Sequence, residues 1–178
     1  MSDSSASLAY TLEGGVAWIK VTGRANCVIG AEFLSLVQGL RAKEIQQFAL
    51  DLRDCVVMDS SFLGTLAGLE QEFGLGNLQA GTHVIQLVGA NTRVTELIRN
   101  LGLDEYFRLN PNHLTFPEQW IPVPPSASRT SRLECSKVSL EAHEVIVRLN
   151  PANEAKFRDV LNFLKEDVKR LEGGGEGS

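Results

Sequence analysis

The spacing of apolar and polar positions changes along the first part of the chain, and each spacing predicts an element. Residues 8–12 and 16–21 are rich in apolar side chains, and Gly14-Gly15 separates them. This pattern predicts two strands joined by a hairpin turn. An amphipathic helix follows, because apolar residues then recur at steps of three and four positions. These residues are Phe33, Leu34, Val37 and Leu40.

Residues 48–73 combine a predicted strand, a polar turn and a predicted helix. Apolar residues alternate at the start and continue to Met58, where Asp59, Ser60 and Ser61 interrupt them. Helical spacing then begins at Phe62 and places the polar trio at the N-terminus of a helix. A helix N-terminus has unpaired N–H groups and the positive end of the macrodipole. The trio therefore occupies a position that favours a carboxylate or a phosphate.

The next segments repeat the alternation of strand and helix. Residues 83–88 form a nearly continuous apolar run between glycines, typical of a strand buried on both faces. Asn91 is placed to cap a following helix, and residues 103–109 are expected to add a short strand. An initial hairpin followed by alternating strands and helices predicts an α/β fold with a mixed β-sheet packed with amphipathic helices.

The strand, polar turn and helix resemble the phosphorylation site of STAS domains, the anti-sigma factor antagonists. Residues 50–64, LDLRDCVVMDSSFLG, carry the resemblance. Residues 21–24 stand where the family has a strand and a glycine turn, and residues 94–107 match its closing helix. The similarity covers roughly residues 8–109. Phe62 stands where many members have glycine.

The resemblance implies a bacterial regulatory binding module without enzymatic activity. Its partner would be an anti-sigma factor of the serine kinase type, which binds the unphosphorylated domain and releases it once the serine is modified. The phosphoacceptor maps onto Ser60, with Ser61 as the less favoured acceptor. Asp51, Asp59 and Phe62 are expected to join both serines in the partner-binding surface, although helical spacing also suits Phe62 as a core residue. Residue chemistry alone assigns Asp59 or Ser60 only a helix-capping role.

Proline marks a boundary after this unit. The predicted division is a STAS-like domain in residues 1–116, a linker in 117–131, a mostly helical extension in 132–171 and a disordered tail in 172–178. Within the extension, Val145-Ile146-Val147 would also suit a strand. Its last helix has a narrow apolar stripe that packs on its own domain, on a second copy of the chain or on a partner. The stripe consists of Phe157, Leu161, Leu164, Val168 and Leu171.

Composition and charge exclude several classes of function. The net charge of −5 argues against nucleic acid and anionic membranes as direct partners. No apolar run is long enough to span a bilayer, and the first ten residues lack the features of a secretion signal, so we expect a cytoplasmic protein. Three widely spaced cysteines predict reduced thiols. The spacing of the scattered histidines does not favour a metal site, and no Walker-type phosphate-binding loop is present, so we expect no cofactor, with nucleotide binding left as an open alternative.

Three functions follow from these observations. The first is the phosphorylation-controlled binding module. The second is a scaffold that forms a homo-oligomer through its C-terminal helix, with Ser60 acting only as a helix cap. An enzyme ranks last, because a hydrolase needs a base near the serine, and Ser60 lacks the flanking glycines of a Gly-x-Ser-x-Gly nucleophile elbow.

Overall fold

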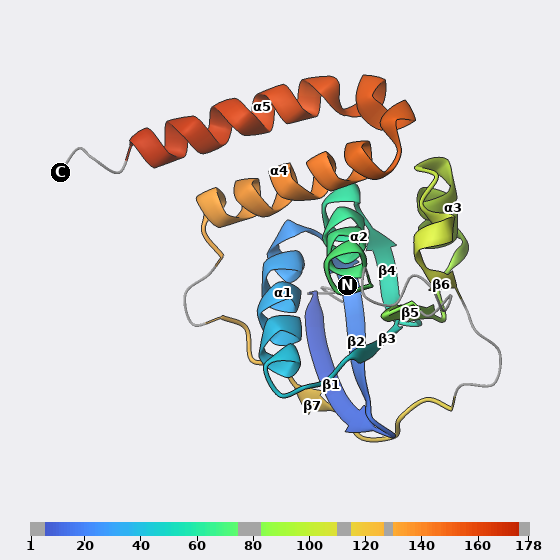
Figure 1. The fold of residues 1–178 in the computed structure, drawn as a ribbon. Coiled ribbons are helices and arrows are strands. Elements are labelled where there is room, and N and C mark those ends of the chain that lie inside the picture. Colours follow the sequence, from blue (N-terminus) through green and yellow to red (C-terminus); the bar gives the residue numbers. More distant parts are fainter. Residues whose placement is uncertain (1–5, 75–82, 110–114, 127–129, 175–178) are drawn as a thin grey trace.

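The chain folds into an α/β unit on which two C-terminal helices rest, as the computed structural model in Figure 1 shows. The structure describes residues 6–74, 83–109, 115–126 and 130–174. Within these residues the sheet has seven strands. They are β1 (Ser7–Glu13), β2 (Val16–Ala25), β3 (Gln47–Asp51), β4 (Cys55–Met58), β5 (Ile85–Val88), β6 (Arg108–Leu109) and β7 (Ile121–Pro122).

The sheet is mixed and is centred on β2, which pairs with β1, β3 and β4. The strand order is β6-β5-β3-β2-β1-β7, with β4 beside the end of β2. β1 runs antiparallel to β2, and β7 runs antiparallel to β1. The pairs β2–β3, β2–β4, β3–β5 and β5–β6 are parallel. Gly14 and Gly15 join β1 to β2 with φ values of 60° and 80°, a conformation that two-residue hairpin turns require and glycine adopts readily.

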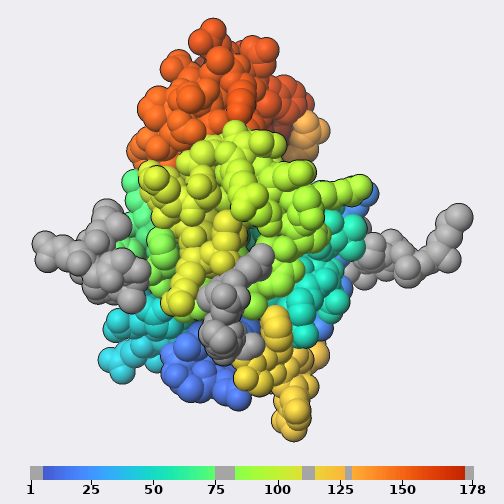
Figure 2. Space-filling model, turned by 90° about the vertical axis from the view of Figure 1, so that its right-hand side faces the viewer, coloured from blue at the N-terminus to red at the C-terminus, as the bar shows by residue number. Residues whose placement is uncertain are grey.

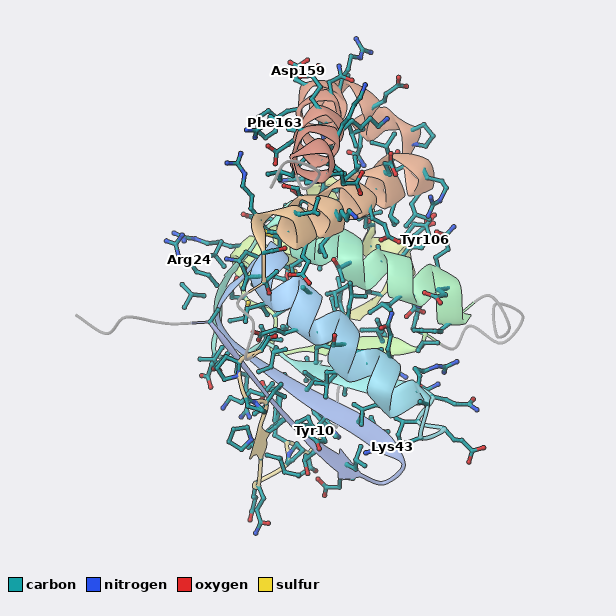
Figure 3. All side chains as sticks on the ribbon, turned by 90° about the vertical axis from the view of Figure 1, so that its left-hand side faces the viewer. Tyr10, Arg24, Lys43, Tyr106, Asp159 and Phe163 are labelled. Carbon is teal, nitrogen blue, oxygen red and sulfur yellow. A yellow bond between two sulfur atoms is a disulfide. The ribbon has the colours of Figure 1, made fainter. Side chains whose placement is uncertain are left out.

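The described part of the chain has five α-helices. They are α1 (Cys27–Arg41), α2 (Ser60–Gly74), α3 (Thr92–Asn100), α4 (Arg132–Leu149) and α5 (Glu154–Gly173), with the 3₁₀ turns η2 (Asp104–Tyr106) and η3 (Pro151–Asn153). α1 and α2 lie together on one face of the sheet (Figures 1 and 3). Their apolar faces meet there, and the rings of Phe33 and Phe62 lie 5.4 Å apart in the core.

The predicted linker takes part in the sheet. Ile121 and Pro122 form β7, opposite Tyr10 and Ala9 of β1. Just before β7, the segment from residue 115 contributes apolar side chains to the face of the sheet that α1 and α2 leave open. There the ring of Phe116 packs 5.8 Å from Trp18.

α4, η3 and α5 form an antiparallel pair of helices, which we call the C-terminal hairpin. Ser131 and Glu134 begin α4 with a capping box, so residues 132–149 are helical where the sequence left strand as an alternative. The apolar stripe of α5 faces α4, and Leu164 is buried there. α5 continues to Gly173, while residues 175–178 of the predicted tail lie outside the described residues. Oligomerisation through this helix stays a prediction.

The turn of the hairpin rests on the end of α3, where Figure 2 shows the two segments in contact. The side-chain amides of Asn150 and Asn153 both donate to the carbonyl of Leu101, at 3.0 and 2.8 Å. Lys156 donates to the carbonyl of Asn100 at 2.9 Å. These carbonyls end a helix and have no intrahelical partner, so the hairpin supplies the missing donors.

Two of the three cysteines are paired. Cys27, the first residue of α1, forms a disulfide with Cys135 in the first turn of α4, and their Cα atoms are 5.2 Å apart. The expectation of reduced thiols is therefore wrong for this pair. Cys55 is free and buried, and burial raises its pKa. The two paired residues are separated by 108 positions, so only the packing of α4 on α1 brings them together.

Candidate functional site

The junction between β4 and α2 places the polar trio at a helix N-terminus, as the sequence predicts. Asp59 caps the helix, because its Oδ1 accepts a hydrogen bond from the Phe62 N–H at 3.0 Å. Asp59 is exposed, yet desolvation by the surrounding chain raises the pKa of its carboxyl. Hydrogen bonds from the Phe62 and Ser61 N–H groups oppose that rise.

Ser60 is half-buried and contacts the C-terminal hairpin. Its Oγ lies 2.9 Å from Nε2 of His143 in the middle of α4. Nδ1 of the same ring lies 2.6 Å from the backbone carbonyl of Ser139, which only accepts hydrogen bonds. In the neutral imidazole Nδ1 therefore carries the proton, and Nε2 accepts from the Ser60 hydroxyl. The buried His143 ring is held from its other side by Phe157 of α5, at 4.8 Å between ring centroids.

The next two residues of α2 point into the protein. Ser61 is buried under α4, and its Oγ lies 3.0 Å from Oγ of Ser139. Phe62 is fully buried in the core against Phe33. Of the predicted site residues on α2, Ser60 thus stays closest to the surface, beside the exposed Asp59.

Asp51 lies at the end of β3 and is also fully buried. Both of its carboxylate oxygens accept from the guanidinium of Arg53, at 3.0 and 2.8 Å. Arg53 is exposed and stacks over the ring of Phe116, 3.5 Å from the centroid. The hydrogen bonds that its guanidinium donates to Asp51 raise the pKa of Arg53 above its ordinary value. Asp51 itself does not reach the surface; it holds the exposed guanidinium of Arg53 in a fixed position there.

The C-terminal hairpin reaches Ser60 because α2 has a narrow outer face. A Cβ atom on Gly64 would lie 2.3 Å from the Ala142 carbonyl oxygen, a distance that no side chain tolerates. One turn later, a Cβ on Gly68 would only touch Val145, at 3.5 Å. Of the two glycine positions, Gly64 is the one at which the backbone of α4 crowds α2.

Sequence reasoning missed His143, Ser139 and the two glycines of α2. A glycine inside a helix costs roughly 1 kcal/mol relative to alanine. Gly64 and Gly68, four residues apart in a predicted helix, were therefore a signal for a close neighbour. No comparable signal existed for His143, because a histidine on α4 shows its role only next to Ser60.

In the described residues, no group of three or more His, Cys, Asp or Glu side chains is placed so that it could bind a metal ion. Over the same residues, no helix combines the length and the apolar composition that crossing a bilayer requires.

Comparison with known proteins rests on structure. No family model matches the chain, and no curated protein matches it. The crystal structure of an anti-sigma factor antagonist from Mycobacterium paratuberculosis does match, with a TM-score of 0.51 and 20% sequence identity. The match covers 62% of this chain and 89% of that one. The chain has the fold of an anti-sigma factor antagonist.

A second solved structure, the anti-sigma factor antagonist SpoIIAA in its unphosphorylated form, matches with a TM-score of 0.49 and 13% identity. That match covers 61% of this chain and 90% of SpoIIAA. The predicted STAS-like fold is confirmed by the first comparison. More than a third of this chain has no counterpart in the Mycobacterium paratuberculosis structure.

Proposed function

We propose that this protein is a regulatory binding module that docks an anti-sigma factor of the serine kinase type and is switched by phosphorylation of Ser60. The observation that carries the proposal is the position of Ser60, directly after the capping Asp59, at the N-terminus of α2 in a fold shared with anti-sigma factor antagonists. The kinase supplies the ATP chemistry, and this chain supplies the hydroxyl. Both partners act in the bacterial cytoplasm.

The electrostatics at the helix N-terminus support a switch that leaves the domain folded. Phosphorylation adds about −1.5 to −2 charges at neutral pH. The first turn of α2 stabilises negative charge through its N–H groups and the positive end of the helix dipole. A docked partner would instead have to desolvate the phosphate beside Asp59, and unpaired burial of such a charge costs several kcal/mol. Binding is therefore lost while folding is kept.

The predicted binding surface divides into contact and support. Asp59 and Ser60 contact the partner from the start of α2. Ser61 joins them once α4 has moved away from α2. Asp51 acts through the guanidinium of Arg53. Phe62 supports the surface from the core.

Phosphopeptide mapping of the protein from its own cells, grown with and without stress, tests the proposal. We expect phosphate on Ser60 whose occupancy changes between the two conditions. Ser60→Ala should abolish the phosphopeptide signal, whereas Ser61→Ala should keep it. In a pull-down from the same cells, Ser60→Asp should lose the serine kinase that the unmodified protein retains. A Ser60 without phosphate in every condition contradicts the proposal.

A second candidate function is an esterase, and the Ser60–His143 contact favours it. A serine hydroxyl 2.9 Å from a histidine nitrogen is the first half of a hydrolytic triad, with the Ser139 carbonyl where such triads often have a carboxylate. A fluorophosphonate probe decides between the two functions. Labelling of Ser60 that is lost in His143→Ala supports the esterase, and an unlabelled protein supports the binding module.

A further inference from the structure

The surface around Ser60 is already occupied by a helix of the same chain. Three contacts show that α4 lies along α2, because the two residues of each pair are almost equally far apart in the sequence. Ser139 meets Ser61, Ala142 meets Gly64, and Val145 meets Gly68. His143, the residue after Ala142, holds the hydroxyl of Ser60, the residue before Ser61. A kinase that has to bring ATP to Ser60 needs the space that α4 fills.

We propose that the C-terminal hairpin is a redox-controlled cover of Ser60, held closed by the Cys27–Cys135 disulfide and released when a dithiol reduces it. The disulfide joins the first residue of α1 to the first turn of α4, at the end of the hairpin where the chain enters it. This inference rests on the proposed function for its biological meaning, because it adds a second control to the same serine.

The contacts between α2 and α4 favour reversible opening. Two hydroxyls of α2, on Ser60 and Ser61, pair with polar groups of α4, and each group can exchange that hydrogen bond for one with water. Apolar packing under α4 comes from the buried Val145 and Ile146, with Leu149 and Phe157 beside them, and the hairpin turn is hydrogen-bonded to the end of α3; these contacts hold the reduced hairpin for part of the time. The disulfide therefore decides how often the hairpin opens.

The hairpin keeps its own structure when it leaves α2. Asp167 of α5 is buried and accepts from Ser136 of α4 at 2.7 Å and from Arg132 at 3.0 Å, and it also pairs with Arg170. These bonds join α4 to α5 and do not involve the domain. The hairpin thus moves as one unit once its contacts with α2 and with the end of α3 are released.

The cysteines are accessible to a reductant. Cys27 and Cys135 are each partly exposed, whereas Cys55 is buried. In cytosolic proteins of most organisms disulfides are rare, and those that form are usually transient and redox-sensing. A pair of this kind fits a compartment whose redox state varies.

The chemistry is thiol–disulfide exchange. A thiolate of the dithiol attacks one sulfur of the pair, which forms a mixed disulfide and expels the other cysteine as a thiolate that takes up a proton. The second thiol of the reductant then attacks the mixed disulfide and releases the remaining cysteine. The protein gains two electrons and two protons, and the dithiol leaves as a disulfide.

Hydrogen exchange of the full chain tests the cover without a kinase. The probe is dithiothreitol, and the readout is the exchange rate of peptides from α2 and α4. We expect the α4 amides and the first turns of α2 to exchange about 100-fold faster after reduction, with β3 unchanged as the sign of an intact domain. Cys135→Ser should exchange rapidly without dithiothreitol, and Cys55→Ser should behave as the parent protein. Equal rates in the oxidised and reduced proteins overturn the proposal.

Direct access to position 60 gives a second readout. In a Cys55→Ser background, Ser60→Cys places a thiol at that position, and its rate of alkylation by a maleimide is measured. We expect about tenfold faster alkylation when Cys27→Ser and Cys135→Ser are added. Unchanged alkylation overturns the cover whatever phosphopeptide mapping finds. Rapid alkylation together with a Ser60 that is never phosphorylated would instead keep the cover and reject the proposed function.

Discussion

The two faces of α2 differ in what they require of their neighbours. The inner face buries large apolar residues, Phe62, Leu63, Leu66 and Leu69, against the sheet and α1. The outer face presents Ser61, Gly64 and Gly68 to α4, with hydroxyls and bare backbone in place of apolar bulk. Large apolar area makes the inner contact permanent, because its exposure costs about 25 cal/mol per Å². The outer contact depends on close fit, hydrogen bonds, the apolar side chains of Val145 and Ile146, and one disulfide.

The largest effect should come from the inner face. Phe62→Ala removes a fully buried ring that packs against Phe33, and we expect a loss of about 3–5 kcal/mol in the free energy of unfolding. Urea denaturation followed by circular dichroism measures it. Val56→Ala is the control: Val56 is 52% exposed, and the change should stay within about 0.5 kcal/mol. A small loss in Phe62→Ala would mean that the ring is not a core residue in solution.

Gly64→Ala tests the outer face with a single methyl group. The new Cβ would lie 2.3 Å from the Ala142 carbonyl, so α4 has to move away. We expect about 1–3 kcal/mol of destabilisation and earlier proteolytic cleavage of the C-terminal hairpin, with the sheet intact.

The matched control for this change is Gly39→Ala in α1. No atom lies within 4 Å of its Cβ position, so the better helix propensity should stabilise by about 0.5–1 kcal/mol. If both alanine variants behave alike, the close approach of α4 at Gly64 is wrong.

The hydrogen bond between Ser60 and His143 should have a smaller effect. A double-mutant cycle with Ser60→Ala and His143→Ala isolates it, and we expect a coupling free energy of about 0.5–1.5 kcal/mol. Urea denaturation of the four proteins supplies the values. A coupling indistinguishable from zero would show that the two side chains do not interact in solution.

The smallest effect is a pH dependence of stability that arises in the C-terminal hairpin and not in the domain. Hydrogen bonding to Ser136 and the cations Arg170 and Arg132 lower the pKa of Asp167. Its contribution to stability is therefore present above the unfolded pKa of about 3.9, and it is lost as pH falls through the lower folded value. Asp167→Asn should destabilise the protein most near pH 6, and the difference from the parent should shrink as the pH is lowered through 4 and below.

Urea midpoints across this pH range provide the measurement. The exposed Asp159 on the outside of α5 (Figure 3) offers the control, since Asp159→Asn should leave the pH profile unchanged. The pKa of Glu70 in α2 is shifted in the opposite direction from that of Asp167. Burial raises its pKa, so its contribution is present below its unfolded pKa and falls as pH rises through the folded value. A pH-independent effect of Asp167→Asn would contradict the assigned ion pairs.

Local signals in the sequence predicted most of the domain. Gly14-Gly15 marked the turn between β1 and β2, and the change from apolar residues to Asp59-Ser60-Ser61 marked the start of α2. These signals work because each depends on neighbours within one or two turns of chain. The ambiguity at residues 145–147 ended in a helix, because the capping box at Ser131 and Glu134 starts α4.

Contacts between distant segments were not predictable in the same way. Ser60 and His143 lie 83 positions apart, and Cys27 and Cys135 lie 108 apart. The spacing of the two residues in each pair does not predict that they meet. Which residue of α4 lies next to Ser60 depends on how α4 is placed on α2, and the sequence alone does not show that placement. The cysteine count even favoured reduced thiols, because an odd number spread over the chain is not typical of a disulfide framework.

The sequence by itself determined the order of strands and helices, the mixed α/β class and the polar helix start at Ser60, because periodicity and capping are local. Only the tertiary structure decided that α4 lies on the outer face of α2, that His143 holds Ser60 and that two distant cysteines meet. The physical reason is the missing Cβ at Gly64 and Gly68, which lets two backbones approach. Where that approach occurs depends on the packing of all the helices together.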